Sequence, residues 1–378
     1  MKMKRHGAAL GIVAAGALLL TACGSDNNTQ SGGSTGGSTT TAAGAKPDCG
    51  GKKSLKSSGS TAQANAMSRF VSKYNAECDG YNLDYTGNGS GAGINEFLAK
   101  QTDFAGSDSA LSASKGEVDK AKTRCDGNPA WNLPTVFGPI AITYNIPGVS
   151  ELALDGPTLA KIFSGQITNW NDAAIKKLNP SASLPDLKIA VVYRSDESGT
   201  TDNFQQYLTA AGGGAWTKGA GKVFAGGVGS GGSKNDGVAT ILKQTSGGIA
   251  YVEWSFALNS KLATASIATT EGGTPVKVSA ETVGKAIDAA KFKNESGNDL
   301  ALDLSSIHGS KVAGAYPIVL ATYEVVCSKY SDADTGKAVK AFLTVAINDG
   351  QTGLDANGYV PLPSKLKDKL SAAVKAIS

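Results

Sequence analysis

The stretch VVYRSDESGT, residues 191–200, combines a short apolar run, a polar loop and the start of a helix. Val191–Tyr193 is typical of a buried strand, and Ser198–Thr200 supplies residues that favour a helix N-terminus. The unpaired N–H groups of such a terminus, together with the guanidinium of Arg194, favour a tetrahedral oxyanion. The stretch therefore predicts a strand–loop–helix unit with an anion-binding loop, in which Asp196 orients the arginine.

Outward from this stretch, short apolar runs alternate with helical periodicity along the chain. Strands are expected at residues 53–57, 83–86, 104–106, 139–144, 189–193 and 248–252. Helices are expected at residues 63–78, 93–100, 115–124, 203–210, 237–245 and 338–348, and glycine-rich loops at 212–214 and 226–232. Such alternation predicts an α/β fold with largely parallel sheets.

Two extended segments that contain proline, Trp131–Thr135 and Gly314–Pro317, are predicted to cross between two lobes. The first lobe is then discontinuous and consists of residues 49–134 and 316–378. The second lobe, residues 135–315, is inserted between these two parts.

The start of the chain is typical of an exported lipoprotein. Basic residues precede the apolar run Ala8–Leu20, which is short for a membrane span. Leu20–Cys23 resembles a bacterial lipobox, so residues 1–22 are predicted to be a signal peptide and Cys23 to carry palmitate and other acyl chains. The rest of residues 23–48 is rich in Gly, Ser and Thr and is predicted to be a flexible tether. The folded part is therefore expected outside the cytoplasm, anchored to the outer face of the cell membrane.

Composition excludes several classes of function. The 378 residues carry a net charge of +4, and the predicted signal peptide contributes three positive charges, so binding of nucleic acid through bulk charge is not expected. With only His6 and His308, a His-rich metal site is excluded, and a catalytic triad would depend on His308 alone. No metal or other cofactor is predicted.

Four cysteines follow the lipobox: Cys49, Cys78, Cys125 and Cys327. In the oxidising environment outside the cytoplasm, an even number indicates two disulfides. Three pairings are possible, and the sequence does not choose among them.

Two more loop–helix junctions, Gly59–Ala62 and Gly89–Gly93, offer the same combination of glycine, hydroxyl and helix N-terminus. Asp108 is the most diagnostic residue if it faces the same site, because its carboxylate repels an anion unless the ligand brings a proton. Hydrogen phosphate carries such a proton at neutral pH and sulfate does not, so Asp108 would discriminate against sulfate.

These residues resemble the phosphate-binding lipoproteins of ABC-type phosphate-specific transporters, especially the actinobacterial branch. The resemblance covers about residues 50–370. The motifs that carry it are Gly59-Ser60-Thr61, Gly87-Asn88-Gly89-Ser90-Gly91, Asp103-Phe104 with Ser107-Asp108, Phe137-Gly138-Pro139-Ile140, Asn145-Ile146-Pro147-Gly148, Leu154-Asp155-Gly156, Ile162-Phe163, Arg194-x-Asp196-x-Ser198-Gly199-Thr200, Asn235-Asp236-Gly237 and Tyr316-Pro317-Ile318.

The resemblance implies a class II periplasmic-binding-protein fold, in which two α/β lobes joined by a two-crossing hinge close on dehydrated phosphate. It implies a binder and not an enzyme, acting as a monomer that delivers inorganic phosphate to ABC permease subunits with a cytoplasmic ATPase. The implied phosphate ligands are Thr61, the backbone N–H of Ala62, Ser90, Asp108, Arg194, Ser198, Gly199 and Thr200, with Asp196 orienting the arginine.

Alternatives stay open at this point. The same site could hold another tetrahedral oxyanion, sulfate or molybdate, although Asp108 argues against both. A secreted phosphate-ester hydrolase is a weaker interpretation, because neither Ser90 nor Ser198 lies in a Gly-x-Ser-x-Gly elbow. A dinucleotide enzyme would use Gly87-x-Gly89-x-x-Ala92 with Asp108, a short match of low specificity. At Asn235-Asp236-Gly237 the preceding Ser233-Lys234 depart from the family pattern, and no ligand role is predicted there.

Overall fold

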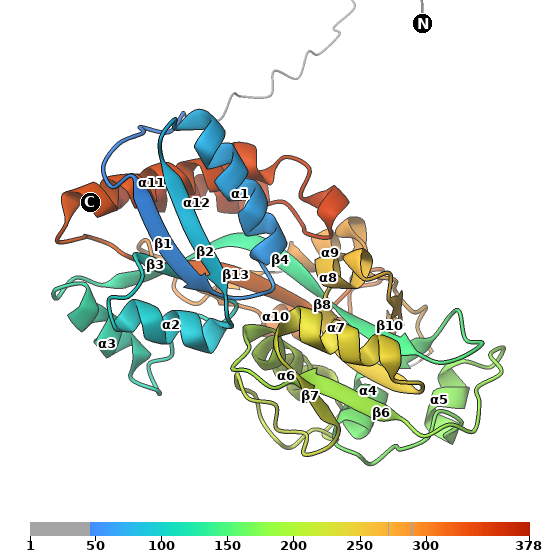
Figure 1. Cartoon of the computed structure of the whole chain (residues 1–378). Coiled ribbons are helices and arrows are strands. Elements are labelled where there is room, and N and C mark those ends of the chain that lie inside the picture. Colours follow the sequence, from blue (N-terminus) through green and yellow to red (C-terminus); the bar gives the residue numbers. More distant parts are fainter. Residues whose placement is uncertain (1–45, 271, 289) are drawn as a thin grey trace, which may run out of the picture. The chain divides into compact units, whose positions relative to one another are not determined.

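The computed structural model describes residues 46–378 except 271 and 289 (Figure 1). The predicted signal peptide, the lipidation site Cys23 and most of the predicted tether therefore lie outside the described residues. Within the described part, no helix is long and apolar enough to cross a membrane.

The elements alternate as the sequence predicts. The strands are β1 (Ser54–Gly59), β2 (Asn82–Gly87), β3 (Phe104–Ser107), β4 (Ala130–Asn145), β5 (Ala153–Asp155), β6 (Ala190–Arg194), β7 (Ser230–Gly232), β8 (Gly248–Glu253), β9 (Ala263–Thr264), β10 (Ser266–Ala268), β11 (Lys291–Phe292), β12 (Leu302–Asp303) and β13 (Val319–Cys327). The helices are α1 (Ala64–Glu77), α2 (Ser90–Leu98), α3 (Glu117–Arg124), α4 (Gly156–Phe163), α5 (Ala173–Leu178), α6 (Gly199–Ala211), α7 (Lys234–Gln244), α8 (Trp254–Asn259), α9 (Ala280–Ile287), α10 (Ser305–His308), α11 (Ala333–Ile347) and α12 (Ser364–Ala376), with 3-10 turns η1 (Asp349–Gln351) and η2 (Asp355–Asn357).

A nine-stranded sheet organises the fold, in the order β2-β1-β3-β13-β4-β8-β6-β7, with β9 also paired to β4. The strands at each end are parallel: β1 with β2 and β3, and β6 with β7 and β8. At the centre, β13 runs antiparallel to β3 and β4, and β4 runs antiparallel to β8. The prediction of largely parallel sheets is therefore wrong at the centre, where the sheet is mixed.

The sheet is mixed at its centre because the long strand β4 pairs with two antiparallel neighbours. Its first part, residues 130–139, pairs with β13, and its second part, residues 140–145, pairs with β8. The predicted crossing Trp131–Thr135 is accordingly a stretch of buried or half-buried strand inside β4. One further prediction was wrong: residues 230–232 of the expected glycine-rich loop form the edge strand β7. The division into lobes at residues 134/135 and 315/316 stays a prediction.

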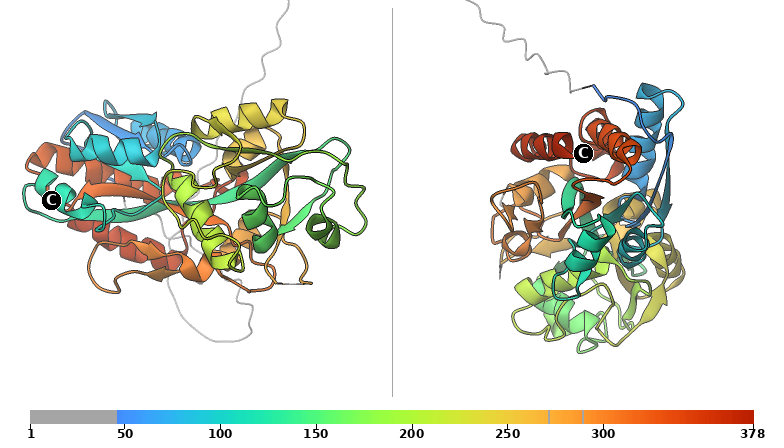
Figure 2. Two further views of the ribbon diagram at one scale, coloured as in Figure 1. Left: turned by 90° about the horizontal axis from the view of Figure 1, so that it is seen from below. Right: turned by 90° about the vertical axis from the view of Figure 1, so that its left-hand side faces the viewer.

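Helices cover the sheet and join distant parts of the chain. At the β1 end, α1 packs against α11 (Figure 1). Between these helices, Tyr74 meets Phe342 edge-on with ring centroids 5.5 Å apart. The C-terminal helices α11 and α12 lie beside the first folded segment, which contains β1 and α1, in both views of Figure 2. Near β6 and β8, Phe163, Phe204 and Tyr251 form a second aromatic cluster.

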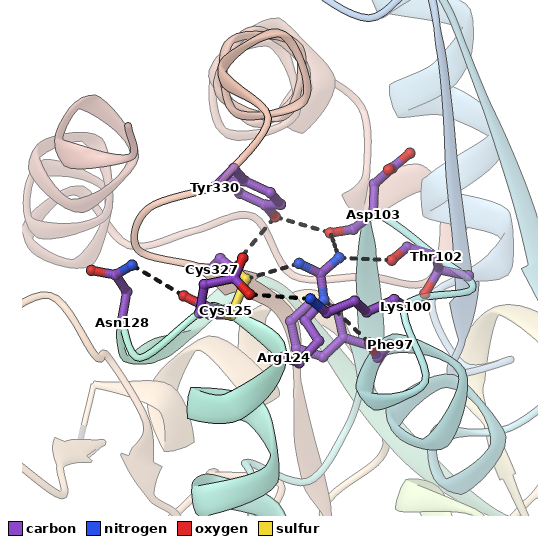
Figure 3. The surroundings of a disulfide bond; sticks show 10 residues. Phe97, Lys100, Thr102, Asp103, Arg124, Cys125, Asn128, Cys327 and Tyr330 are labelled. Carbon is purple, nitrogen blue, oxygen red and sulfur yellow. Dashed lines mark hydrogen bonds and ion pairs between the residues drawn. A yellow bond between two sulfur atoms is a disulfide. The ribbon is translucent and has the colours of Figure 1, made fainter.

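Two disulfides resolve the pairing that the sequence leaves open. Cys49 pairs with Cys78, and Cys125 pairs with Cys327. The second bond joins the end of α3 to the end of β13, and Arg124 lies against it (Figure 3). The Arg124 guanidinium donates to the Cys327 sulfur at 3.1 Å and lies over the Phe97 ring, 4.4 Å from its centroid.

Candidate anion-binding site

The carboxyl ends of parallel strands position the site. β1, β2 and β3 end at Gly59, Gly87 and Ser107, and β6 ends at Arg194, so the loops that follow carry the predicted ligands. Loops at the carboxyl ends of parallel strands are the usual binding position in α/β sheets, because helix N-termini converge there.

The first loop runs from Gly59 to the start of α1. Gly59 has φ +140°, and a Cβ there would lie 1.9 Å from the carbonyl oxygen of Gly106, so only glycine fits. The Ser60 hydroxyl accepts the N–H of Ala62 at 3.0 Å, and the Thr61 hydroxyl accepts from the side-chain amide of Asn235 at 2.9 Å. Both donors predicted in this loop, the Ala62 N–H and the Thr61 hydroxyl, are buried.

The loop after β2, at the start of α2, lies close to the loops after β3 and β6. Ser90 is the first residue of α2, and its hydroxyl accepts the N–H of Asp108 at 3.1 Å. The loop after β6 leads to α6, where the Ser198 hydroxyl caps the helix by accepting the N–H of Thr201 at 3.2 Å. A Cβ on Gly199 would lie 2.6 Å from Cβ of Asp108 and 2.7 Å from the Ser90 hydroxyl, so glycine permits this close approach.

Asp108 lies at the centre of these loops and is 2% exposed. Its Oδ1 accepts from the hydroxyls of Ser60 and of Thr322, the latter at 2.8 Å. Its Oδ2 lies 3.5 Å from the hydroxyls of Ser90 and Thr200. Burial raises the pKa of Asp108, although these hydroxyls and the charge of Arg194 act in the opposite direction.

Arg194 supplies the opposite charge from the end of β6 and is also 2% exposed. Its Nε donates to Oδ1 of Asp196 at 2.8 Å, and its Nη2 donates to Oδ2. Its Nη1 is buried and has no hydrogen-bond partner among the described residues. Burial alone would raise the pKa of Asp196, but the bonds and charge of Arg194, with the N–H of Lys234, hold that pKa below its usual range.

The structure thus brings the predicted residues to one place. Thr61, Ala62, Ser90 and Asp108 come from the first part of the chain, and Arg194, Asp196, Ser198, Gly199 and Thr200 come from β6 and the start of α6. The Thr200 hydroxyl lies 3.5 Å from Oδ2 of Asp108, and beside these residues the N–H of Gly91 donates to the Glu197 carbonyl at 3.0 Å.

Sequence reasoning missed three contributors. Ser60 belongs to a recognised motif, but its bond to Asp108 depends on β1 lying beside β3. Thr322 comes from β13, where no local pattern marks it. Asn235, where no role was expected, links two elements by donating to Thr61 and accepting the N–H of Glu253 at 3.1 Å.

The site offers hydroxyl and backbone donors, one guanidinium and one carboxylate. These groups are of the kinds that bind a small oxyanion in proteins. Within residues 46–378, leaving aside 271 and 289, no group of three or more His, Cys, Asp or Glu side chains is placed to hold a metal ion.

Comparisons with known proteins point the same way. The PBP superfamily domain matches residues 29–349. The chain is 58% identical to phosphate-binding protein PstS 3 of Mycobacterium tuberculosis, over 100% of both chains, and 35% identical to phosphate-binding protein PstS of Xylella fastidiosa, over 85% of both chains. Among solved structures, it is similar to a high-affinity periplasmic phosphate-binding protein bound with phosphate, with a TM-score of 0.68, 25% identity and coverage of 84% of this chain and 93% of the other.

Proposed function

The chain belongs to the PBP superfamily and, within it, to the PstS family of phosphate-binding proteins, and from this premise we propose that it binds inorganic phosphate outside the cytoplasm and delivers it to an ABC phosphate importer. The phosphate would occupy the site between Asp108 and Arg194. The chain acts in this proposal as a binding protein and not as an enzyme.

One observation carries the proposal most directly. Arg194 is buried and held on one side by Asp196, yet its Nη1 has no partner in the part of the chain that the structure describes. A buried guanidinium nitrogen without an acceptor is costly, so its position favours an anionic ligand. The neighbouring carboxylate of Asp108 then requires that this anion carry a proton, which hydrogen phosphate does and sulfate does not.

The remaining predicted ligands would complete the coordination. Hydroxyls of Thr61, Ser90, Ser198 and Thr200 and backbone N–H groups of Ala62, Gly199 and Thr200 are donors that favour phosphate oxygens. Several come from the N-termini of α2 and α6, whose dipoles favour negative charge. Because the donors come from separate segments, binding would draw these segments together, with higher affinity for the closed arrangement.

Anchoring and partners belong to the same proposal. Cys23 would carry the lipid, and residues 23–48 would hold the folded part at the outer face of the membrane, close to the permease subunits. The binding unit would be a monomer. Labelling cells with palmitate analogues tests the anchor: the wild-type chain should be labelled and sediment with membranes, and Cys23→Ala should lose both properties.

Calorimetric titration tests the function. Phosphate-stripped protein should bind phosphate one-to-one near neutral pH and bind sulfate at least about a hundredfold more weakly, a difference of roughly 2.7 kcal/mol. Asp108→Asn should weaken phosphate binding and improve sulfate binding, whereas the control Asp103→Asn, in a residue paired with Lys52, should change neither. Folded, ligand-free protein that gives no heat with phosphate would refute the proposal, and equal affinity for sulfate would reopen the choice of oxyanion.

A further inference from the structure

The two oxygens of the Asp108 carboxylate have different surroundings. Oδ1 accepts hydrogen bonds from Ser60 and from Thr322, while the contacts of Oδ2 within the described part of the chain are the two of 3.5 Å to Ser90 and Thr200. We propose that Ser60 and Thr322 are positioning residues that occupy Oδ1 and thereby leave Oδ2 as the atom that accepts the proton of bound hydrogen phosphate. This inference rests on the proposed function and assigns the selectivity for a protonated oxyanion to residues outside the ligand shell.

The direction of the Ser60 hydroxyl is set by its neighbours. Its oxygen accepts the N–H of Ala62 at 3.0 Å, so its proton is left to donate to Asp108. The backbone carbonyl of the same residue accepts from the Tyr85 hydroxyl at 2.7 Å, which fixes the loop against β2. Ser60 is 1% exposed, so no bulk water competes for this bond.

Thr322 reaches the carboxylate from the centre of the sheet. Along the β13–β4 ladder Thr322 pairs with Val136 and Tyr323 pairs with Pro134, so one residue of β4 is skipped. Pro134 has no N–H for the ladder, and a bulge at such a position redirects nearby side chains. On the other side of β13, the antiparallel pairing with β3 sets Tyr323 opposite Ser107, so Thr322 comes next to Asp108, and its fully buried hydroxyl donates to Asp108 at 2.8 Å.

Both backbone groups of Asp108, its N–H and its carbonyl, form hydrogen bonds. Its N–H donates to the Ser90 hydroxyl at 3.1 Å, and its carbonyl accepts from the Asn203 amide at 2.7 Å. With the backbone and Oδ1 fixed, rotation of the carboxyl group is restricted. Oδ2 consequently keeps its direction toward the hydroxyls of α2 and α6, which are themselves predicted ligands.

Ser60 and Thr322 also have an electrostatic effect on Asp108, which depends on the charges around this carboxyl group. Arg194 on β6 lowers the pKa of Asp108, and so do the bonds from Ser60 and Thr322, against the effect of burial. Two buried carboxyl groups face it from other strands, Glu253 on β8 and Glu324 on β13, and burial raises the pKa of both, that of Glu324 to about 8.

Two tyrosines complete these surroundings. Tyr85 on β2 and Tyr323 on β13 are buried with raised pKa values, so both stay neutral. Since Glu324 is also largely neutral at pH 7, the hydroxyl bonds and Arg194 are what favour the ionised form of Asp108. Removing one hydroxyl should raise the pKa of Asp108 further, because the ionised form loses a donor.

Sulfate binding reports the ionisation of Asp108 because sulfate itself does not change its protonation state over the pH range of the titration. Ionised Asp108 repels sulfate, whereas protonated Asp108 becomes a donor that sulfate accepts. The pH at which sulfate binding appears therefore follows the pKa of Asp108. Thr322→Val keeps the shape and removes the hydroxyl, so sulfate binding should extend to higher pH while phosphate binding at pH 7.5 weakens about tenfold.

The experiment is calorimetric titration of the full-length, phosphate-stripped protein with phosphate and with sulfate, from pH 5 to pH 8.5. Thr322→Val and Ser60→Ala should both move the sulfate profile upward in pH, and Thr322→Ser should restore the wild-type profile. The matched control is Thr143→Val, which removes a buried strand hydroxyl bonded to the Ala250 carbonyl, and it should leave both profiles unchanged.

The outcomes separate this inference from the proposed function. Wild-type protein without phosphate binding would refute the function itself. Normal wild-type binding, with Thr322→Val and Ser60→Ala weakening both anions equally and leaving the pH profile of sulfate in place, would show a purely structural role and overturn the inference. Circular dichroism and thermal unfolding confirm that each variant is folded, and if Thr322→Val is not, Ser60→Ala decides.

Discussion

Asp108 and Asp196 lie on the two sides of the site and are the same residue type with opposite electrostatics. Asp108, after β3, is surrounded by hydroxyl groups, and burial raises its pKa. Asp196, after β6, receives two guanidinium N–H groups and the Lys234 N–H, and its pKa is lowered. One aspartate is therefore a permanent counter-ion and the other is poised to respond to a proton. What an aspartate does in a site depends on its partners and not on its presence in a motif.

The two sides also differ in how they are held. We call the loops after β1, β2 and β3 the β3 side, and Arg194–Thr200 the β6 side. The disulfides join elements next to the β3 side: one links the segment before β1 to the end of α1, and the other links the end of α3 to the end of β13. The β6 side is held by an ion pair. In the proposed function, the β3 side carries the carboxylate that discriminates between anions, and the β6 side carries the arginine that attracts them.

The largest expected effect comes from the covalent links next to the β3 side. Cys125→Ser/Cys327→Ser opens a loop of 202 residues, and Cys49→Ser/Cys78→Ser opens one of 29. Chain entropy predicts losses of about 5 and about 4 kcal/mol in the free energy of unfolding. Urea unfolding of both double variants measures the difference, and a larger loss for Cys49→Ser/Cys78→Ser would contradict the ranking.

Arg194→Ala should abolish most of the attraction on the β6 side. It removes the buried cation and leaves Asp196 without its partner, so phosphate affinity should fall by about 4 kcal/mol, roughly a thousandfold in Kd. Arg194→Lys keeps the charge but not the paired geometry and should give an intermediate loss. Calorimetry measures both, with the exposed Lys261→Ala as control. An unchanged Kd for Arg194→Ala would remove the arginine from the site.

Asp196→Asn should destabilise the ligand-free protein at neutral pH by about 2 kcal/mol, because hydrogen bonds between charged groups are lost and Arg194 stays buried. The stability that ionised Asp196 contributes is present above the unfolded-state pKa and is lost as pH falls through the lower folded-state pKa. Thermal unfolding should therefore show a difference at pH 7 that shrinks in acid. A difference that grows in acid would contradict this assignment.

Asp108→Asn should have the smallest effect and the opposite sign, stabilising the ligand-free protein at pH 7. Asparagine keeps an oxygen for Ser60 and Thr322 and removes a buried charge. Because the folded-state pKa of Asp108 is raised, ionisation costs stability as pH rises through that value, and below the unfolded-state pKa the cost is absent. The variant and the wild type should therefore converge near pH 4 in the same unfolding assay. A less stable variant at pH 7 would show that the carboxylate is not strained by burial.

Much of the fold and of the candidate site was predictable because it depends on short stretches of sequence. The loops Gly59–Ala62, Gly89–Gly93 and Ser198–Thr200 each join a strand to a helix within a few residues, so spacing alone indicates their geometry. The even number of cysteines after the predicted export signal indicated two disulfides, and the structure contains both. The family resemblance added which side chains would share one ligand, and the structure places those residues together.

The tertiary structure alone decided the rest, because it depends on strand order and register. Sequence separation does not show that Cys125 meets Cys327, or that β13 inserts between β3 and β4 and reverses the direction of the central strands. Thr322 becomes a partner of Asp108 through that insertion, because the register of β13 with β3 sets Tyr323 opposite Ser107. The residues that could bind an oxyanion were thus fixed by local sequence, whereas the contacts that prepare Asp108 to recognise a proton arose from packing between segments far apart in the chain.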